Sequence, residues 1–93
     1  MEQKFLVVWA ANREKAEKLG VRMRPIDPEK AMQTAHRSLS GTRVSDGFDS
    51  LAQKGQLALS LEALAVDKRF TGLFSDEEAN TALTRLLDAG YRF

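Results

Sequence analysis

Glycine residues that follow short helix-favouring segments constrain the fold of this chain most strongly. A glycine after the last turn of a helix readily adopts the left-handed backbone conformation, so it marks the end of that helix. Such glycines recur along the whole sequence, at Gly20, Gly41, Gly55 and Gly90. We therefore predict a mainly α fold, a small single-domain bundle of about five short helices.

The most strongly marked helix lies between Ser75 and Gly90. Ser75 and Glu78 have the spacing of a capping box, in which each side chain accepts a hydrogen bond from the backbone of the other residue. Tyr91 is expected to fold back against the last turn. Apolar residues at helical spacing give this helix an expected buried stripe of Ala79, Leu83, Leu86 and Leu87.

Asp27 and Pro28 predict the start of another helix, because they supply an N-cap and a proline at the first helical position. This helix should run to about Leu39, and residues 40–45 should then form a polar connector. Its expected apolar stripe consists of Ala31, Met32, Ala35 and Leu39.

Two shorter helices are predicted in the middle of the chain. One opens at Ser45 or Asp46 and closes at Gly55. The other runs from about residue 61 to 66, with Ser60 as its N-cap and Glu62 in its first turn. Leu57, Leu61 and Leu64 are expected to face inward.

Residues 2–19 admit two interpretations. Residues 5–9 form a short apolar run that suits a strand, and residues 21–26 could supply its partner at a sheet edge. Opposite charges four residues apart, as in Arg13 and Glu17, instead support a helix. We favour a helix that ends at Gly20, and a minor β element at residues 4–10 is the alternative.

Residue types that carry catalysis and metal binding are scarce. The chain has no cysteine, and its one histidine, His36, lies at the edge of an apolar stripe, where we expect a partly buried imidazole with one hydrogen-bonded nitrogen. No nucleophile motif, calcium loop or phosphate-binding glycine pattern occurs. We therefore predict no catalytic residue, no metal site and no cofactor, and we expect a binding protein rather than an enzyme.

Length and hydropathy bear on size and location. The longest apolar run covers residues 5–11, whereas a membrane span needs about 20 residues. Together with the lack of cysteine, this favours a soluble protein of the cytoplasm with no membrane partner. A chain of 93 residues forms one domain, residues 1–93, with a thin core, so we also expect that a homodimer would gain from burying a shared face.

Charge is distributed unevenly. Residues 1–45 carry nine Lys or Arg against five Asp or Glu, and residues 46–93 carry five against eight. Arginine suits bidentate contacts to carboxylates, so the basic half predicts a protein partner with an acidic surface. The predicted partner-binding residues are Arg22, Arg24, Arg37 and Arg43. Such a protein would act as an inhibitor, adaptor or assembly factor.

Aromatic residues offer a second possible contact surface, because aromatic side chains are enriched at protein interfaces. Phe70 and Phe93 lie outside the predicted helices, so we expect them to be partly exposed. Most of the six aromatic residues considered for such a surface are nevertheless expected in the core; the six are Trp9, Phe48, Phe70, Phe74, Tyr91 and Phe93.

Two segments near the C-terminal end, residues 59–65 and 82–91, resemble pieces of a bacterial winged-helix domain. They correspond to a short leading helix and to a recognition helix that ends in a Gly-aromatic step. The stretch from Val66 to Thr81 is several residues longer than in that family, and no wing sequence follows. The resemblance implies a DNA-binding transcriptional regulator as the alternative function, with nucleic acid contacted by Thr81, Thr84 and Arg85.

Overall fold

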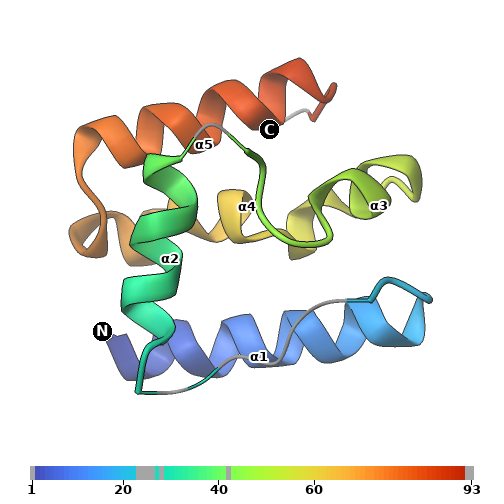
Figure 1. Cartoon of the computed structure of the whole chain (residues 1–93), viewed down its shortest axis with the longest axis horizontal. Coiled ribbons are helices and arrows are strands. Elements are labelled where there is room, and N and C mark those ends of the chain that lie inside the picture. Colours follow the sequence, from blue (N-terminus) through green and yellow to red (C-terminus); the bar gives the residue numbers. More distant parts are fainter. Residues whose placement is uncertain (1, 23–26, 28, 42, 92–93) are drawn as a thin grey trace.

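The computed structural model describes residues 2–22, 27, 29–41 and 43–91 and consists of helices joined by short connections (Figure 1). It is 71% helical, and the described residues form no strand, which confirms the prediction of a mainly α bundle. The α-helices are α1 (Glu2–Lys18), α2 (Ala31–Ser40), α3 (Phe48–Gln53), α4 (Leu61–Ala65) and α5 (Asp76–Asp88). Two 3₁₀ helices, η1 (Leu57–Leu59) and η2 (Lys68–Leu73), flank α4.

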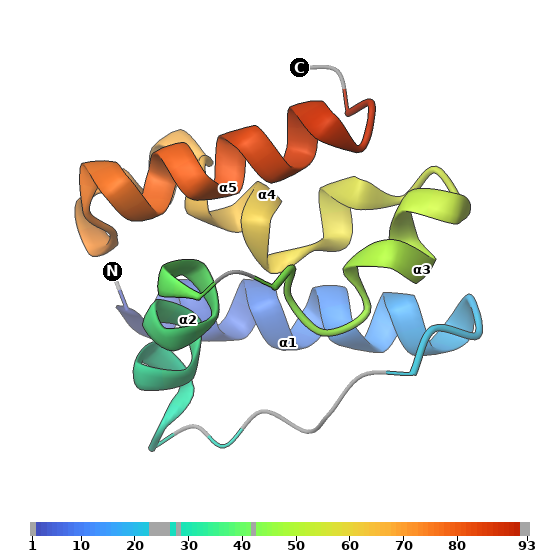
Figure 2. The same cartoon turned by 45° about the horizontal axis from the view of Figure 1, so that its top comes forward.

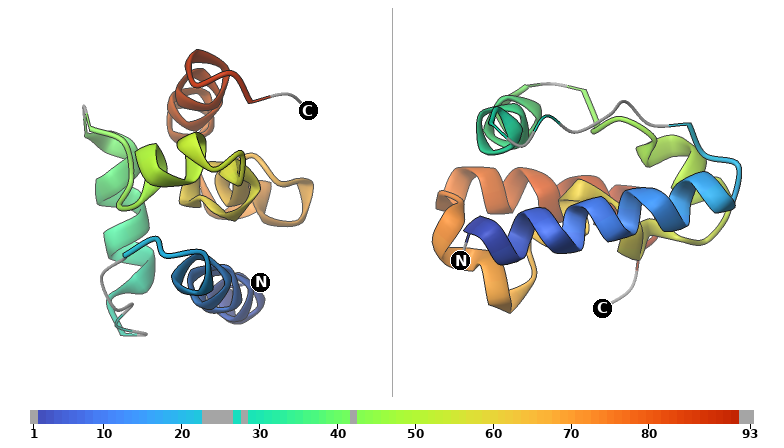
Figure 3. Two further views of the ribbon diagram at one scale, coloured as in Figure 1. Left: turned by 90° about the vertical axis from the view of Figure 1, so that its right-hand side faces the viewer. Right: turned by 90° about the horizontal axis from the view of Figure 1, so that it is seen from below.

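The two longest helices, α1 and α5, form the outer layers of the molecule. The short helix α4 lies between them, and α2 crosses one side (Figures 1 and 2). The end-on view in Figure 3 shows the same order, with α1 and α5 on opposite sides of the central segments. The helix α4 contacts both outer helices, α1 and α5, and four of its five residues are buried.

The ambiguous N-terminal segment is a helix, α1, and not a strand. Arg13 and Glu17 form the predicted ion pair, with 2.8 Å between nitrogen and oxygen, and Gly20 ends the helix with a φ of 87°. The buried side of α1 consists of Phe5, Trp9, Asn12 and Ala16. Leu19 lies just beyond the helix and is exposed.

The helix predicted to start at Asp27 begins about one turn later, at Ala31. Asp27 instead makes a local turn, in which its carboxylate accepts a hydrogen bond from the backbone N–H of Glu29 and its carbonyl oxygen accepts one from Lys30. This turn competes with helical hydrogen bonding, as Asp side chains often do. The predicted first-turn residue Pro28 lies outside the described residues. The buried stripe of Ala31, Ala35 and Leu39 agrees with the prediction.

The helix predicted to open at Ser45 or Asp46 has a different cap. Its N-cap is Gly47, in the left-handed conformation with a φ of 78°, because Ser45 turns toward the interior instead. The helix α4 begins after Ser60 as predicted, and the Ser60 side chain accepts a hydrogen bond from the Ala63 N–H at 3.2 Å. Leu57, Leu61 and Leu64 face inward, also as predicted.

The last helix, α5, confirms the capping box and corrects the apolar stripe. Ser75 and Glu78 exchange both hydrogen bonds of the box. However, the buried positions are Glu78, Ala82 and Leu86, while Leu83 and Leu87 are 37% and 55% exposed. The helix is rotated so that Glu78 reaches α2, and this rotation turns the two leucines outward.

Two hydrophobic clusters fill the interior. Phe5 lies at the centre of the first, where its ring centroid is 5.3–5.5 Å from those of Trp9, Phe70 and Phe74. Phe70 is fully buried, so its predicted exposure is wrong: η2 directs it onto α1. Phe93 lies outside the described residues. The second cluster contains Ala16, Val21, Phe48, Leu51, Leu57 and Leu86.

Candidate functional site

The structure brings two of the predicted partner-binding arginines together. Arg22, just after α1, and Arg43, between α2 and α3, line one surface hollow of about 710 Å³. We call it the Arg22/Arg43 hollow. Arg37 is exposed on the last turn of α2 and is not among the residues that line this hollow. Arg24 lies outside the described residues.

Both arginines of the hollow are exposed, and neither forms an ion pair with a residue in the described part of the chain. The rest of the lining contains apolar, acidic and small polar residues, namely Val44, Ser45, Asp46, Gly47, Phe48, Asp49 and Ser50. Each guanidinium offers several N–H donors in a planar fork that fits a carboxylate. The hollow can therefore bind an acidic group without first breaking an internal ion pair of either arginine.

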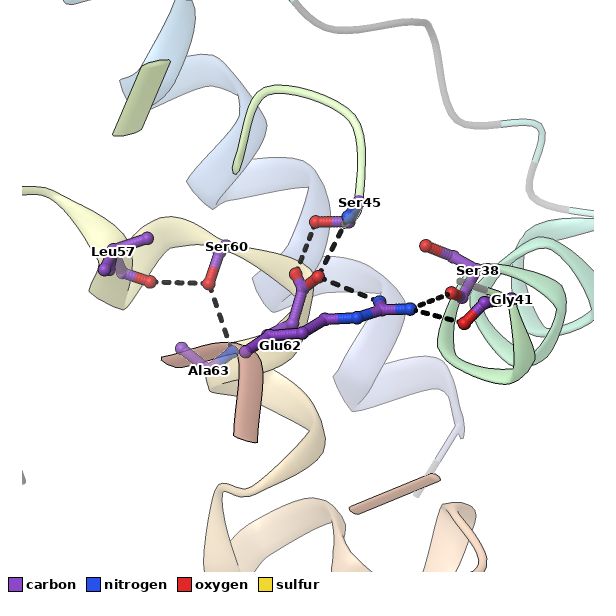
Figure 4. Close-up of polar contacts among 8 residues, drawn as sticks. Ser38, Gly41, Ser45, Leu57, Ser60, Glu62 and Ala63 are labelled. Carbon is purple, nitrogen blue, oxygen red and sulfur yellow. Dashed lines mark hydrogen bonds and ion pairs between the residues drawn. The ribbon is translucent and has the colours of Figure 1, made fainter. Parts of the chain in front are cut away.

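A buried polar cluster lies beneath the segment that carries Arg43. Its centre is Glu62 on α4, whose side chain has no solvent exposure. The Glu62 carboxylate accepts hydrogen bonds from the Ser45 N–H at 2.9 Å and from the Ser45 hydroxyl, and it forms an ion pair with Arg85 at 3.1 Å (Figure 4). Arg85 also donates to the carbonyl oxygens of Ser38 and Gly41, at 3.0 and 2.9 Å.

We call these residues, Ser38, Gly41, Ser45, Glu62 and Arg85, the Glu62 clamp. Every charge in it has a partner, as a buried ion pair requires if its desolvation is to be offset. The clamp holds the connection between α2 and α3 at both ends, because Gly41 is bound by Arg85 and Ser45 by Glu62. It thereby holds Gly41 and Ser45, each of which lies two residues from Arg43 in the chain.

Sequence reasoning assigned Glu62 only to the first turn of its helix and missed this role. The position is well prepared locally, because the Ser60 hydroxyl caps α4 and also donates to the Leu57 carbonyl oxygen at 2.6 Å. One signal in the sequence was informative. Glu62 is the single charged residue between Leu57 and Val66, and an acid within an apolar run must find a buried partner when the run folds inward.

The residues of the DNA-binding alternative also lie around one hollow. Thr81, Thr84 and Arg85 line it together with Gly41 and Asn80, and its volume is about 310 Å³. The Arg85 side chain is only 9% exposed, and its guanidinium bonds to Glu62 and to two carbonyl oxygens. In this arrangement Arg85 has a structural role, and only the threonines offer hydroxyl groups near the surface.

His36 is placed as predicted, with one ring nitrogen in a hydrogen bond. Its Nδ1 lies 2.6 Å from the carboxylate of Glu78, which also accepts the backbone N–H of Ser75 at 2.8 Å. Burial raises the pKa of Glu78, but the hydrogen bonds from Ser75 and His36 outweigh this effect, so the pKa lies below its ordinary value. The pair joins α2 to α5 and holds Glu78 as an anion.

Within the described residues, no group of three or more His, Asp or Glu side chains lies close enough together to hold a metal ion. None of the helices in that part of the chain combines the length and the apolar character needed to cross a membrane. Comparison of the chain with protein-family models, with curated proteins and with solved structures gave no match.

Proposed function

We propose that this chain is a non-catalytic docking protein, acting as an inhibitor, adaptor or assembly factor, whose Arg22/Arg43 hollow binds an acidic surface of a protein partner. The observation that carries the proposal is the convergence of two exposed arginines, from segments on either side of α2, on one hollow. The predominance of basic residues in positions 1–45 adds a field that attracts an acidic partner.

The Glu62 clamp supports the same function. A binding residue on a connection between helices loses conformational entropy when its ligand orders it, and this loss weakens binding. Because the clamp binds Gly41 and Ser45, two residues close to Arg43 in the chain are held in place before the partner arrives. A cytoplasmic location is part of the proposal and rests on the absence of cysteine.

The test is binding of a fluorescent Glu-rich peptide, measured by anisotropy. The double substitution Arg22→Glu and Arg43→Glu should weaken binding at least tenfold, about 1.4 kcal/mol, with little change in melting temperature, because both side chains are exposed. The matched control is Arg37→Glu, which reverses an exposed arginine outside the hollow lining. Equal losses in the control and the double variant would reject the hollow as the site.

DNA binding is the second candidate, favoured only by the gathering of Thr81 and Thr84 at one hollow. Binding of a duplex DNA probe distinguishes DNA binding from docking on an acidic protein. A DNA-binding protein would lose affinity steeply as salt rises, because phosphate contacts release counterions, and would lose affinity on replacement of both threonines by alanine. Tight duplex binding that survives the Arg22→Glu and Arg43→Glu reversal would favour this candidate over the docking proposal.

A further inference from the structure

Residues 5–11 of α1 form an apolar run that continues around the helix, although only one side of this run faces the core. Phe5 and Trp9 are buried, whereas Val7 is 65% exposed and Ala10 and Ala11 are exposed beside it. A helix that is apolar all round is normally covered all round. In the view from below in Figure 3, α1 runs across the front of the molecule, and no other described element covers its outer side.

Charged residues flank this exposed face at helical spacing. Lys4, Val7, Ala11 and Glu14 follow one another at intervals of three, four and three residues, so they form a single stripe. All of them are exposed, and neither Lys4 nor Glu14 forms an ion pair with a described residue. We call this stripe, with Ala10 beside it, the outer face of α1.

The order of charges along the stripe selects its partner. When two copies of α1 lie antiparallel with the two-fold axis beside residue 9, Val7 of each chain meets Ala11 of the other. In the same register Lys4 of each chain meets Glu14 of the other, so both ends of the contact are complementary. A parallel pair would instead place like charges opposite each other.

We infer that the outer face of α1 is an interface with a second copy of this chain, formed by antiparallel pairing of the two α1 helices. No residue that lines the Arg22/Arg43 hollow belongs to this face, so the inference is independent of the proposed function. A helix of this length spans about 26 Å, and one face of it buries less than a standard interface of about 1,600 Å². The dimer is therefore a weak one that forms at high protein concentration.

Sedimentation equilibrium between about 10 µM and 1 mM tests the association, because small interfaces dissociate in this range. Val7→Lys should abolish the dimer. Leu87→Lys is the matched control, since Leu87 on α5 is a comparably exposed aliphatic residue at 55%, and it should leave the dimer unchanged. A wild-type chain that stays monomeric at 1 mM, or a dimer lost with Leu87→Lys and kept with Val7→Lys, overturns the inference.

Charge exchange tests the orientation. Lys4→Glu and Glu14→Lys should each weaken association by about fivefold or more, since each creates two like-charge contacts in the dimer. The double variant should restore wild-type association, because the exchanged charges are complementary again. Failure of the double variant to recover, with a normal helical circular dichroism spectrum, overturns the antiparallel pairing.

Disulfide trapping gives the register directly, because the natural chain contains no cysteine. Chains carrying Val7→Cys are mixed with chains carrying Ala11→Cys and oxidised slowly. The antiparallel register predicts that linked heterodimers predominate, since these two positions face each other. Predominance of Val7→Cys homodimers would show a parallel pair and overturn the inference.

Discussion

Ser45 and Ser75 both use their hydroxyl groups in hydrogen bonds, but their surroundings differ. The Ser75 hydroxyl accepts the Glu78 N–H at the exposed start of α5, where water can replace it. The Ser45 hydroxyl donates to the carboxylate of Glu62, and both residues are buried. Removing a donor from a buried carboxylate leaves that group short of a partner, which costs more than losing an exposed cap.

We therefore expect Ser45→Ala to be the more destabilising of two matched substitutions. Ser75→Ala should cost about 1 kcal/mol of unfolding free energy, the usual value for a lost N-cap. Ser45→Ala should cost about 2–3 kcal/mol, because a hydrogen bond to a buried charge is lost. Urea unfolding of both variants gives the ranking. The sequence alone predicts the opposite ranking, because it indicates Ser45 only as an N-cap that Asp46 could replace. A larger loss of stability for Ser75→Ala than for Ser45→Ala would exclude a buried hydrogen bond between Ser45 and Glu62.

At the scale of elements, polar side chains make two of the links between helices. Arg85 joins α5 to Glu62 on α4 and to the end of α2, and Glu78 joins α5 to His36 on α2. In both links a charged or polar group is paired with a complementary group. The loss of stability on substitution therefore depends on whether the remaining partner is left buried without a hydrogen bond or counter-charge. Comparing the substitution of one partner with the substitution of both measures this cost.

Arg85→Met should destabilise the protein by about 3 kcal/mol or more, because it leaves the buried Glu62 without a counter-charge. Combining it with Glu62→Gln removes the lone charge while retaining an acceptor for Ser45. The double variant should therefore be more stable than Arg85→Met alone, which a denaturant double-mutant cycle measures. Simple additivity of the two costs would contradict a coupled ion pair.

The hydrogen bonds that Glu78 accepts from Ser75 and shares with His36 predict a pH dependence in the acid range. The pKa of Glu78 is lowered in the folded state, so the unfolded chain binds this proton more readily and stability must fall as the pH drops below about 4.3. Glu78→Gln should flatten this acid loss in urea unfolding measured from pH 6 to pH 3. Asp67, whose pKa is lowered mainly by the side-chain hydrogen bond from Arg69, contributes in the same direction.

The control for this pH experiment is Glu77→Gln, which changes the exposed neighbour on the same turn of α5. It should retain the acid slope of the natural chain. If both substitutions flatten the slope equally, the effect comes from net charge and not from the hydrogen bonds of Glu78 with Ser75 and His36.

At the scale of the whole molecule, sequence patterns identified the helices better than their contacts. Gly20, Ser60 and the Ser75–Glu78 box act within one or two turns, so their effects are local and could be predicted. The stripe of α5 was misplaced because Leu83 and Ala82 differ by only one position along the helix, and contacts with α2 decide which of them faces inward. Patterns that depend on distant segments need the folded chain.

The candidate site likewise depends on segments that are distant in the sequence, so it could be predicted only in part. The sequence supplied Arg22 and Arg43 as basic residues, but their common hollow depends on how the connection after α1 passes the connection before α3. The Glu62 clamp was not predicted at all, since its hydrogen bonds join residues 17, 23, 44 and 47 positions apart. No local pattern specifies pairings of this range.

The long sequence separations within the clamp also determine when it forms. The complete set of Arg85 hydrogen bonds requires α2, α4 and α5 to be in place and the two charges to lose their water. We therefore expect the clamp to close after the folding barrier is crossed. Interactions absent from the transition state govern the unfolding rate alone. Arg85→Met should thus shorten the lifetime of the native state while refolding proceeds at nearly its natural rate, and stopped-flow measurements in urea can separate the two. Slowed refolding would place the clamp in the folding nucleus instead. If the buried ion pair forms only after the transition state, it slows unfolding. The native state of this small protein, whose core is thin, then lasts longer than its equilibrium stability alone would imply.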